Sequence, residues 1–388
     1  MKLLTVIPGI GASYGGPSKS VTELVEALAH QGIEVDMVTT NADTNRQLEV
    51  TLQTWIPQSS YRIQYFPYWH VHDYKISPSL TRWLIKNVAN YDIVMTHANF
   101  SYISSVANWI CRSQKVPYVM NPHGMLEPWA LSYKAWKKRF YYTWFEQPAL
   151  QNASAIRVLA SREIDNVKQL HIDTPLMLAP NGIHCEDFET LPNPQIFLQA
   201  FPKTQQKSLI LFMGRIDPKK GLDLLAKAFA QVHAVFPQTH LVVAGPDNTR
   251  FLSTVQGYFK EAGCLDSVTF TGILTGELKF AAFAAADVYV APSYSEGFSM
   301  SVLEGMASSL PCVITTACNF PEATAANAAI VVEIDSEAIA NALIHCLKYP
   351  DEAKAMGDRA RQFILENYTW DKIAVQMKQV YIDILKSH

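Results

Sequence analysis

The sequence predicts an α/β protein made of two similar halves, each a parallel β-sheet covered by helices. Short runs of β-branched and apolar residues alternate with amphipathic stretches of helical period through most of the chain, which is the pattern of strands joined through helices. A second series of strand, loop and helix begins at 208–213, after the Pro-, Gln- and Asn-rich residues 185–207, which we take as a linker. The 388 residues suffice for two domains of ordinary size.

The individual elements follow from periodicity and from turn residues. The strands expected in the first half are 2–7, 34–40, 91–96, 117–121, 155–159 and 176–179, and the helices are 17–30, 79–90, 102–114, 133–152 and 161–170. The strands expected in the second half are 208–213, 240–244, 268–270, 287–291 and 311–314. Its helices are 222–236, 298–309, 336–348, 351–367 and 370–386, with two more that end near 262 and 286.

Residues 45–78 show no clear period and are expected to be irregular. Their many aromatic side chains suit either an acceptor loop that stacks on sugar rings or a small satellite core. His70, His72 and Asp73 allow a metal site, although the absence of a further ligand set in the sequence favours a surface loop.

A glycine-rich loop follows the first predicted strand but does not match a dinucleotide-binding motif. Tyr14 stands where that motif needs a small residue to let the helix pack closely. The second strand also ends without the acid that would bind a ribose diol. Gly15 and Gly16 instead allow a backbone approach to a ligand, or simply form a flexible turn.

His123 directly follows the predicted strand 117–121 and precedes Gly124. Doubly wound sheets bind their ligands at the carboxyl ends of parallel strands. A single histidine is more often structural than catalytic, but this position favours a functional role.

Residues 291–309 combine a strand end, a polar turn and a helix start, with Glu296 in the turn and Glu304 within the helix. The N–H groups and the dipole of a helix start attract an anion, and carboxylates accept hydrogen bonds from neighbouring hydroxyl groups. Glu296 by itself could be a helix cap, whereas Glu304 lies too far along the helix to cap it. Together they predict a site for a phosphate with hydroxyl groups on both sides, as in a nucleotide-sugar.

Arg215 and Lys220 flank a turn after the predicted strand 208–213. The spacing is not that of a P-loop. Arginine binds phosphate bidentately and lysine acts as a point charge, so we expect this pair to clamp a diphosphate.

Composition narrows the function further. The net charge of −3 gives no footprint for nucleic acid, and the six scattered cysteines lack a C-x-x-C pair, which favours reduced thiols in a cytoplasmic protein. No apolar run approaches the roughly 20 residues of a membrane span. The predicted helix 133–152 is basic and aromatic, and suits either peripheral contact with the inner face of a membrane or packing on the core.

These motifs together resemble the retaining glycosyltransferases of family 4, which have the GT-B fold. They span nearly the whole chain: Gly15-Gly16, His123-Gly124, Pro180-Asn-Gly182, Gly214-Arg215, Lys220-Gly221, Val243-Ala-Gly245, Phe270-x-Gly272, Pro292-Ser293, Glu296-Gly-Phe298, Glu304, Pro321-Glu322 and the helix after Asn367-Tyr-Thr-Trp370. Residues 316–320 depart from the pattern, because many members carry a glycine-bearing turn there. Residues 123–129 are similar to cyanobacterial and other bacterial exopolysaccharide enzymes.

The resemblance implies two Rossmann-like, doubly wound domains that face each other across a cleft. The acceptor domain would be 1–184 plus 371–388, and the nucleotide-sugar domain 185–370. The catalytic set implied is His123, Glu296, Arg215 and Lys220. The donor-binding set implied is Gly15, Gly16, Gly214, Arg215, Lys220, Glu296, Gly297, Phe298, Ser299, Met300 and Glu304. In these sets Glu304 would hold the ribose hydroxyl groups, and His123 and Glu296 would contact the donor sugar. Neither a cofactor nor a divalent metal is expected.

The activity expected is transfer of a hexose from a UDP-sugar, UDP-glucose first, with retained anomeric configuration. The acceptor would be a saccharide or a lipid-linked saccharide in polysaccharide biosynthesis. Two alternatives stay open: a UDP-sugar epimerase of the same fold, and a non-catalytic subunit that binds a sugar-nucleotide.

Overall fold

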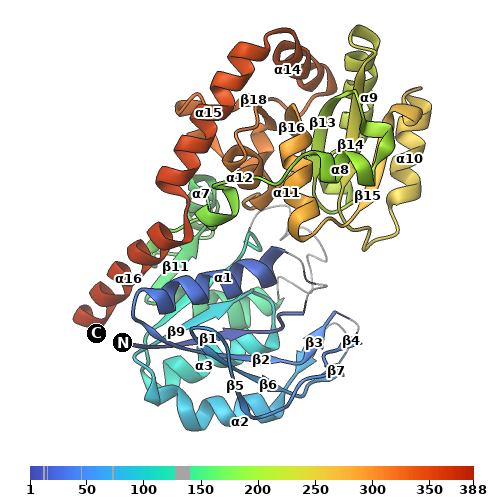
Figure 1. Ribbon diagram of the computed structural model, residues 1–388. Helices are drawn as coiled ribbons and strands as arrows, with labels where there is room; N and C mark the ends of the chain where they lie inside the picture. Colours follow the sequence, from blue (N-terminus) through green and yellow to red (C-terminus); the bar gives the residue numbers. More distant parts are fainter. Residues whose placement is uncertain (12–13, 15, 45, 72–73, 127–139) are drawn as a thin grey trace. The chain divides into compact units, whose positions relative to one another are not determined.

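The structure is a computed structural model that describes residues 1–388 except 12–13, 15, 45, 72–73 and 127–139. Contacts divide the chain into two compact units (Figure 1), one of Met1–Gly182 with Trp370–His388 and one of Ile183–Thr369. Each unit is a parallel sheet between helices, so the predicted α/β class of both halves is confirmed. The binding of acceptor by one unit and donor by the other stays a prediction.

The first unit contains an eight-stranded sheet in the order β12-β11-β10-β9-β1-β2-β6-β5. Only β5 is antiparallel to its neighbour. The strands are β1 (Lys2–Ile7), β2 (Glu34–Thr40), β5 (Trp55–Pro57), β6 (Arg62–Phe66), β9 (Ile93–His97), β10 (Tyr118–Asn121), β11 (Ala155–Val158) and β12 (Leu176–Leu178). Two small hairpins lie outside this sheet: β3 (Ala42–Asp43) with β4 (Arg46–Gln47), and β7 (Trp69–Val71) with β8 (Tyr74–Ile76).

Helices cover both faces of this sheet (Figure 1). They are α1 (Gly16–His30), α2 (Pro78–Asn87), α3 (Tyr102–Gln114), α6 (Gln147–Gln151), α7 (Ser161–Gln169) and α16 (Trp370–Ser387). Side chains alternate along β1: Leu3 packs with α1 and α16, and Leu4 packs with α2 and α3. The last helix is tied to α1 by a hydrogen bond of 3.0 Å from Trp370 Nε1 to Glu23.

The expectation that residues 45–78 are irregular is wrong. β6 pairs with β2, and Arg62 and Asp36 face each other in the register. Arg62 Nη2 donates to Asp36 at 2.8 Å and the Tyr91 hydroxyl donates to Asp36 at 2.6 Å, so the buried carboxylate is satisfied only when β6 is in place. Polar residues within the strand had hidden its period in the sequence.

The prediction of one continuous helix over 133–152 is also wrong for the part that the structure describes. Residues 133–139 lie outside the described part, and the remainder contains a π-helical stretch, Tyr142–Glu146, followed by α6. Phe140 and Trp144 are about two-thirds exposed, at 64% and 67%, with ring centroids 6.2 Å apart. This part of the segment is therefore not packed into the core through those rings.

Glu146 within the π-helical stretch makes stability depend on pH. Burial raises its pKa to about 7, although Phe100 N and the Ser105 hydroxyl donate to it. A carboxyl group whose pKa is raised on folding binds its proton more tightly in the folded state. The free energy of unfolding should therefore fall as pH rises from about 4.5 to about 7, by up to about 1.4 kcal/mol per pH unit. Denaturant titrations should show that Glu146→Gln removes this slope, whereas Glu49→Gln, at an exposed glutamate, keeps it. An unchanged slope in Glu146→Gln would contradict the assignment.

The second unit contains a parallel six-stranded sheet in the order β15-β14-β13-β16-β17-β18. The strands are β13 (Ser208–Met213), β14 (Thr239–Ala244), β15 (Val268–Gly272), β16 (Val288–Ala291), β17 (Cys312–Thr315) and β18 (Ile330–Val332). The helices are α8 (Gln195–Ala200), α9 (Leu222–Val235), α10 (Leu252–Glu261), α11 (Gly276–Ala285), α12 (Met300–Ala307), α13 (Pro321–Ala325), α14 (Ser336–Lys348) and α15 (Pro350–Asn367).

One prediction for this unit is wrong, and two short elements were not predicted. Residues 185–207 are not a linker, because they include α8, whose Phe197 is fully buried in the core. β18 and α13 were not predicted, since both are short and follow the turn at 316–320. The predicted helix 298–309 begins at Met300 and ends at Ala307.

Candidate nucleotide-sugar site

The order of the second sheet reverses between β13 and β16. From β13 the chain continues outward through β14 and β15, whereas β16, β17 and β18 extend from the other side of β13. The loops that leave the carboxyl ends of β13 and β16 therefore diverge, and such a point is where open α/β sheets bind ligands. Both predicted anion-binding loops, 214–221 and 292–299, start here.

Glycines let these loops approach each other closely. Gly221 has a φ of +68°, and a Cβ atom there would lie 1.9 Å from the carbonyl oxygen of Pro292. Gly245 has a φ of +149°, and its Cβ would lie 1.8 Å from the carbonyl oxygen of Gly214. No side chain fits either position. The two loops are further joined by a hydrogen bond of 2.7 Å from Tyr294 N to Lys219 O.

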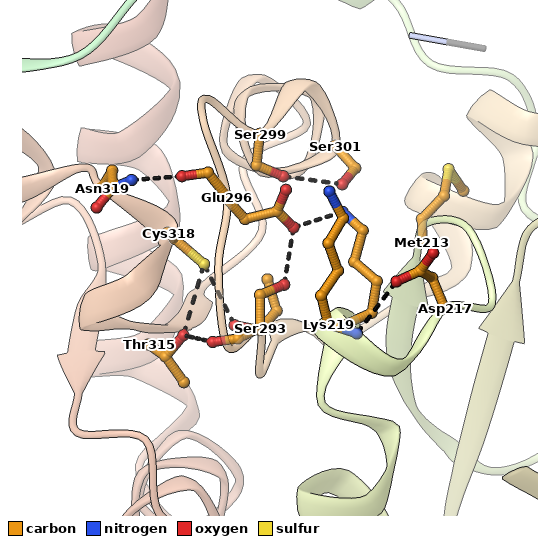
Figure 2. A network of polar contacts seen from close by, with 12 residues as sticks. Met213, Asp217, Lys219, Ser293, Glu296, Ser299, Ser301, Thr315, Cys318 and Asn319 are labelled. Atoms are coloured by element: carbon orange, nitrogen blue, oxygen red, sulfur yellow. Dashed lines mark hydrogen bonds and ion pairs between the residues drawn. The ribbon is translucent and has the colours of Figure 1, made fainter. Parts of the chain in front are cut away.

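Lys220 and Glu296, both predicted from the sequence, form an ion pair between the loops. The Ser293 hydroxyl donates to the same carboxylate oxygen at 2.7 Å, and Asn319 Nδ2 donates to the backbone carbonyl of Glu296. Figure 2 shows Glu296 at the centre of this network, with Ser293 on the same loop and Asn319 on the segment that follows β17. Burial alone raises the pKa of Glu296, but the charge of Lys220 and the hydrogen bonds lower it overall, so the carboxylate is ionised.

The turn 215–220 carries three cations, Arg215, Lys219 and Lys220, and one carboxylate, Asp217, and the charges of Lys219 and Lys220 both act on Glu296. Arg215 is exposed, and its charge lowers the pKa of Lys219, after burial as the larger cause. Lys220 lowers the pKa of Lys219 in the same way, whereas Glu296 raises it. Lys219 was not predicted, because only the ends of the turn 215–220 were read as a clamp. The excess of positive charge makes this turn a site for an anion with more than one negative charge.

The start of α12 adds backbone donors. Its first turn follows Ser299, whose side chain makes no capping hydrogen bond and instead lies 3.3 Å from the Ser301 hydroxyl. The amide groups around Met300 are therefore available to an anion. Gly297 and Phe298 form the turn before the helix, and the Phe298 ring packs on Phe320 at 5.7 Å between centroids.

Glu304 forms an ion pair with a lysine of another helix. Lys279 of α11 donates to its Oε1 at 2.6 Å, and Glu304 is only 8% exposed. Lys279 could not be predicted, because nothing in the order of the chain relates α11 to α12. One carboxylate oxygen is engaged by the lysine, and the role of Glu304 toward a ribose stays a proposal.

His123 lies in the first unit, just beyond β10, with a φ of +53°. Its Nε2 is 2.9 Å from Nδ1 of His97, the last residue of β9, and the two rings stack at 5.2 Å between centroids. Burial and then the charge of Arg157 lower the pKa of His123 to about 3, and burial likewise lowers that of His97. Both rings are neutral at pH 7, so one donates to the other. Of the two outer ring nitrogens, Nε2 of His97 is buried without a partner among the described residues, and we take Nδ1 of His123 as the one that can meet a ligand.

Arg157 was not predicted as a site residue because it lies within β11, whose apolar sequence is typical of a buried strand. Its Nε donates to Ala179 O and its Nη2 to Pro180 O, both at 2.7 Å, and Nη2 also lies 3.2 Å from Asn181 Oδ1. The guanidinium thus holds the Pro180-Asn-Gly182 loop. A lone arginine within an apolar strand was the available signal.

His97 is a positioning residue for His123, which gives a testable expectation. Removing the hydrogen bond in His97→Leu should free the His123 ring, which can then adopt both neutral tautomers. His97→Asn, whose amide can reach the position of Nδ1, should restore the hydrogen bond. Nitrogen NMR of the imidazoles should show one neutral tautomer of His123 in the wild type and in His97→Asn, and a mixture in His97→Leu. A single tautomer in all three would contradict the role.

The remaining predicted residues lie as follows. Gly214 directly follows β13, and a Cβ atom there would lie 3.6 Å from Lys220 Cε. Gly16 is the first residue of α1, and Gly15 lies outside the described residues. The structure therefore brings together the second-unit residues Gly214, Arg215, Lys220, Glu296, Gly297, Phe298, Ser299 and Met300. Glu304 lies farther along α12.

Other features bear on metals and membranes. His72 and Asp73 lie outside the described residues, so the metal hypothesis for 70–73 is not tested. Over the described ranges no group of three or more His, Cys, Asp or Glu is placed to hold a metal ion. All six cysteines are free thiols. In the part of the chain that the structure describes, every helix is too short or too polar to span a membrane.

Comparison with known protein families assigns both units. Residues 14–187 match the family "Glycosyltransferase Family 4", and residues 195–363 match "Glycosyl transferases group 1". The chain belongs to the family-4 glycosyltransferases, as the resemblance implied.

The curated relatives share only about a quarter of the aligned residues with this chain. A GDP-mannose-dependent α-(1-6)-phosphatidylinositol monomannoside mannosyltransferase of Mycobacterium tuberculosis is 28% identical over 208 residues, which cover 51% of this chain and 53% of the relative. This match spans about half the length of that protein. Mannosylfructose-phosphate synthase of Agrobacterium fabrum is 24% identical over 341 residues, which cover 79% of this chain and 73% of the relative.

Solved structures share the fold. Sucrose-phosphate synthase from Thermosynechococcus elongatus aligns with a TM-score of 0.78 at 23% identity over the full length of both chains. HepE of Anabaena in complex with UDP aligns with a TM-score of 0.79 at 16% identity, over 99% of this chain and 100% of HepE. The GT-B fold predicted from the motifs is confirmed by these likenesses.

Proposed function

We propose that this protein transfers a hexose from a UDP-sugar, UDP-glucose first, to an acceptor hydroxyl group with retention of anomeric configuration. One observation carries the proposal: at the switch point of the second sheet, Lys220 of the turn 215–220, which also carries Arg215 and Lys219, forms an ion pair with Glu296 in the loop that leads into α12. That arrangement suits the diphosphate of a sugar-nucleotide. Solved structures of HepE with UDP and with UDP-glucose support the choice of donor through the shared fold.

In the proposed reaction the bond from the sugar carbon C1 to the β-phosphate oxygen breaks, and a bond from the acceptor oxygen to C1 forms on the same face. The leaving β-phosphate oxygen takes the acceptor proton. The cations and the amides of α12 stabilise the charge that develops on the diphosphate, each by about a few kcal/mol. Glu296, ionised, accepts from sugar hydroxyl groups, and the neutral His123 donates through Nδ1.

The proposed transfer needs no divalent metal, because Arg215, Lys219 and Lys220 together with the amide groups at the start of α12 would stabilise the charge on the diphosphate. Transfer measured in excess EDTA should equal transfer in its absence. A loss of turnover that added Mg²⁺ or Mn²⁺ restores would contradict this point.

The donor is tested by a thermal-shift screen with UDP-, GDP- and ADP-sugars. We expect the largest rise in Tm with UDP-glucose, since a ligand that binds only the folded state stabilises it. The names of the two curated relatives favour mannosyl donors as the second candidate. A larger shift with GDP-mannose would replace UDP-glucose in the proposal.

Two other functions are separated by product analysis. Sugar transfer to a saccharide acceptor supports the transferase, interconversion of UDP-sugars without acceptor would identify an epimerase, and binding without either reaction would identify a non-catalytic subunit. The charged set Arg215, Lys220, Glu296 and Glu304 is complete, which favours catalysis.

We propose a saccharide or lipid-linked saccharide of a polysaccharide pathway as acceptor, and a cytoplasmic protein in peripheral contact with the membrane. The support for contact is the exposed aromatic surface of residues 140–145, where Phe140, Trp144 and Phe145 are at least half exposed. Aromatic side chains of this kind favour the membrane interface.

A further inference from the structure

A cavity of about 480 Å³ lies on the outer face of α3 in the first unit. Three segments line it: one face of α3, the hairpin β7–β8 and residues 141–149. The α3 residues of the lining follow the three- and four-residue spacing of a single helix face: Tyr102, Ser105, Val106, Trp109 and Arg112.

Three hydroxyl groups of this lining, those of Tyr102, Ser105 and Tyr141, are already engaged. The Ser105 hydroxyl lies 2.9 Å from the Tyr141 hydroxyl and donates to Glu146 at 3.1 Å. The Tyr102 hydroxyl lies 3.0 Å from the Thr81 hydroxyl. The rest of the lining is mainly ring and aliphatic surface, apart from the Tyr74 hydroxyl and the Arg112 guanidinium. A sugar would need several converging polar groups, so this lining suits a hydrocarbon chain.

A second cavity, of about 730 Å³, adjoins the first, since Trp109 and Arg112 line both. Its other walls include Lys115, Ser113 and Asn152. Arg112 and Lys115 are exposed, and over the described ranges neither forms an ion pair. An apolar cavity thus lies next to a cavity whose lining includes Arg112 and Lys115, and this arrangement suits an anionic amphiphile.

We propose that the two adjoining cavities bind one anionic membrane phospholipid, with an acyl chain in the first cavity and the phosphate on Arg112 and Lys115. Arginine is suited to bind a phosphate bidentately. The rim carries Trp109, Trp144 and Phe145, which are 61%, 67% and 50% exposed, and tryptophan is enriched where membranes meet water.

The position of Arg112 argues for a membrane lipid rather than the acceptor. Arg112 lies ten residues along α3 from Tyr102, about 15 Å from the start of that helix. The second cavity lies at the amino ends of β10 and β11, beside Tyr118 and Ser154. His123 lies at the opposite edge, so a phosphate on Arg112 is remote from it. The proposal rests on the membrane contact proposed above and not on the transfer reaction.

Flotation with vesicles tests the site on the full chain without sugar-nucleotide. The wild type should partition onto phosphatidylglycerol–phosphatidylcholine vesicles and not onto phosphatidylcholine alone. Arg112→Gln should weaken partitioning about fivefold, from about 1 kcal/mol per basic residue. The matched control Arg82→Gln, an exposed arginine on α2, should leave it unchanged. Equal partitioning onto both vesicles, or equal effects of both variants, would overturn the proposal.

Two further variants test the chain cavity. Trp144→Ala should weaken partitioning, whereas Trp69→Ala, at a side chain that is 66% exposed but outside the lining, should not. Phosphatidylglycerol with brominated chains should quench tryptophan fluorescence, and Trp109→Phe should remove part of that quenching. Unchanged quenching in Trp109→Phe, or binding only when a lipid-linked acceptor is added, would overturn the chain assignment. Calorimetry with UDP on the same variants separates this result from the donor site. Each variant should bind UDP with the affinity of the wild type.

Discussion

Lys220→Ala is expected to lower kcat/KM for sugar transfer by a hundredfold or more while the protein still folds. Lys220 is the cation that links the two loops of the switch point, through Glu296. Its loss removes a charge from the site of the leaving diphosphate, and such preorganised donors contribute about 2.7–4 kcal/mol to the transition state. Steady-state kinetics with the donor found in the thermal-shift screen give the ratio.

Stability must be separated from catalysis in this variant. Removing Lys220 leaves the ionised Glu296 buried beside fewer partners, and an uncompensated buried charge destabilises a protein. The double variant Lys220→Ala/Glu296→Gln should therefore recover Tm but not turnover. Lys227→Ala, at an exposed lysine of α9, serves as the matched control. Native turnover in Lys220→Ala would remove Lys220 from the proposed clamp.

Glu304→Ala is expected to weaken UDP binding about tenfold to a hundredfold. The variant loses a hydrogen bond from the ribose diol to the carboxylate oxygen that Lys279 leaves free, and a hydrogen bond to a charged group is worth about 1.5–3 kcal/mol. Isothermal titration calorimetry with UDP gives the affinity. The variant also leaves Lys279 without its carboxylate partner, so part of any effect could pass through that lysine.

Lys279→Met distinguishes the two causes. If Glu304 binds ribose directly, Lys279→Met should keep UDP affinity within a few fold and Glu304→Ala should not. Equal losses in both variants would mean that Glu304 acts only through the ion pair. Native UDP affinity in Glu304→Ala would end the ribose role altogether.

The donor loops could be predicted because their chemistry is local in sequence. Arg215 and Lys220 lie in one turn, and Glu296 follows a recognisable strand end. The two loops meet because β13 and β16 are neighbours in the sheet. The sequence suggested this arrangement only through the resemblance to a family, whereas the strand order shows it directly.

The partners of the predicted residues could not be found in this way. Lys279 reaches Glu304 from another helix, and His97 reaches His123 from another strand. Both pairs are set by tertiary packing, so sequence spacing carries no trace of them. Arg157 was hidden for a different reason: a single arginine does not change the period of an apolar strand.

The fold was predicted well where strands are apolar and less well where they are short or polar. β6 was missed because Arg62 and Gln64 interrupt its apolar pattern, although pairing with Asp36 satisfies Arg62. α8 was taken as a linker because its flanking Pro and Asn residues conceal the buried Phe197. In both cases the tertiary partner, and not local propensity, decides the structure.

The most direct test of the account is the dependence of binding on the number of phosphates. Calorimetry with uridine, UMP and UDP should show affinity rising with each phosphate in the wild type, because the cations of the turn 215–220 bind the diphosphate. In Arg215→Gln/Lys220→Met the gain from the phosphates should largely disappear while uridine binding is kept. The same gain in the wild type and the double variant would contradict the claim that this turn holds the diphosphate of the donor.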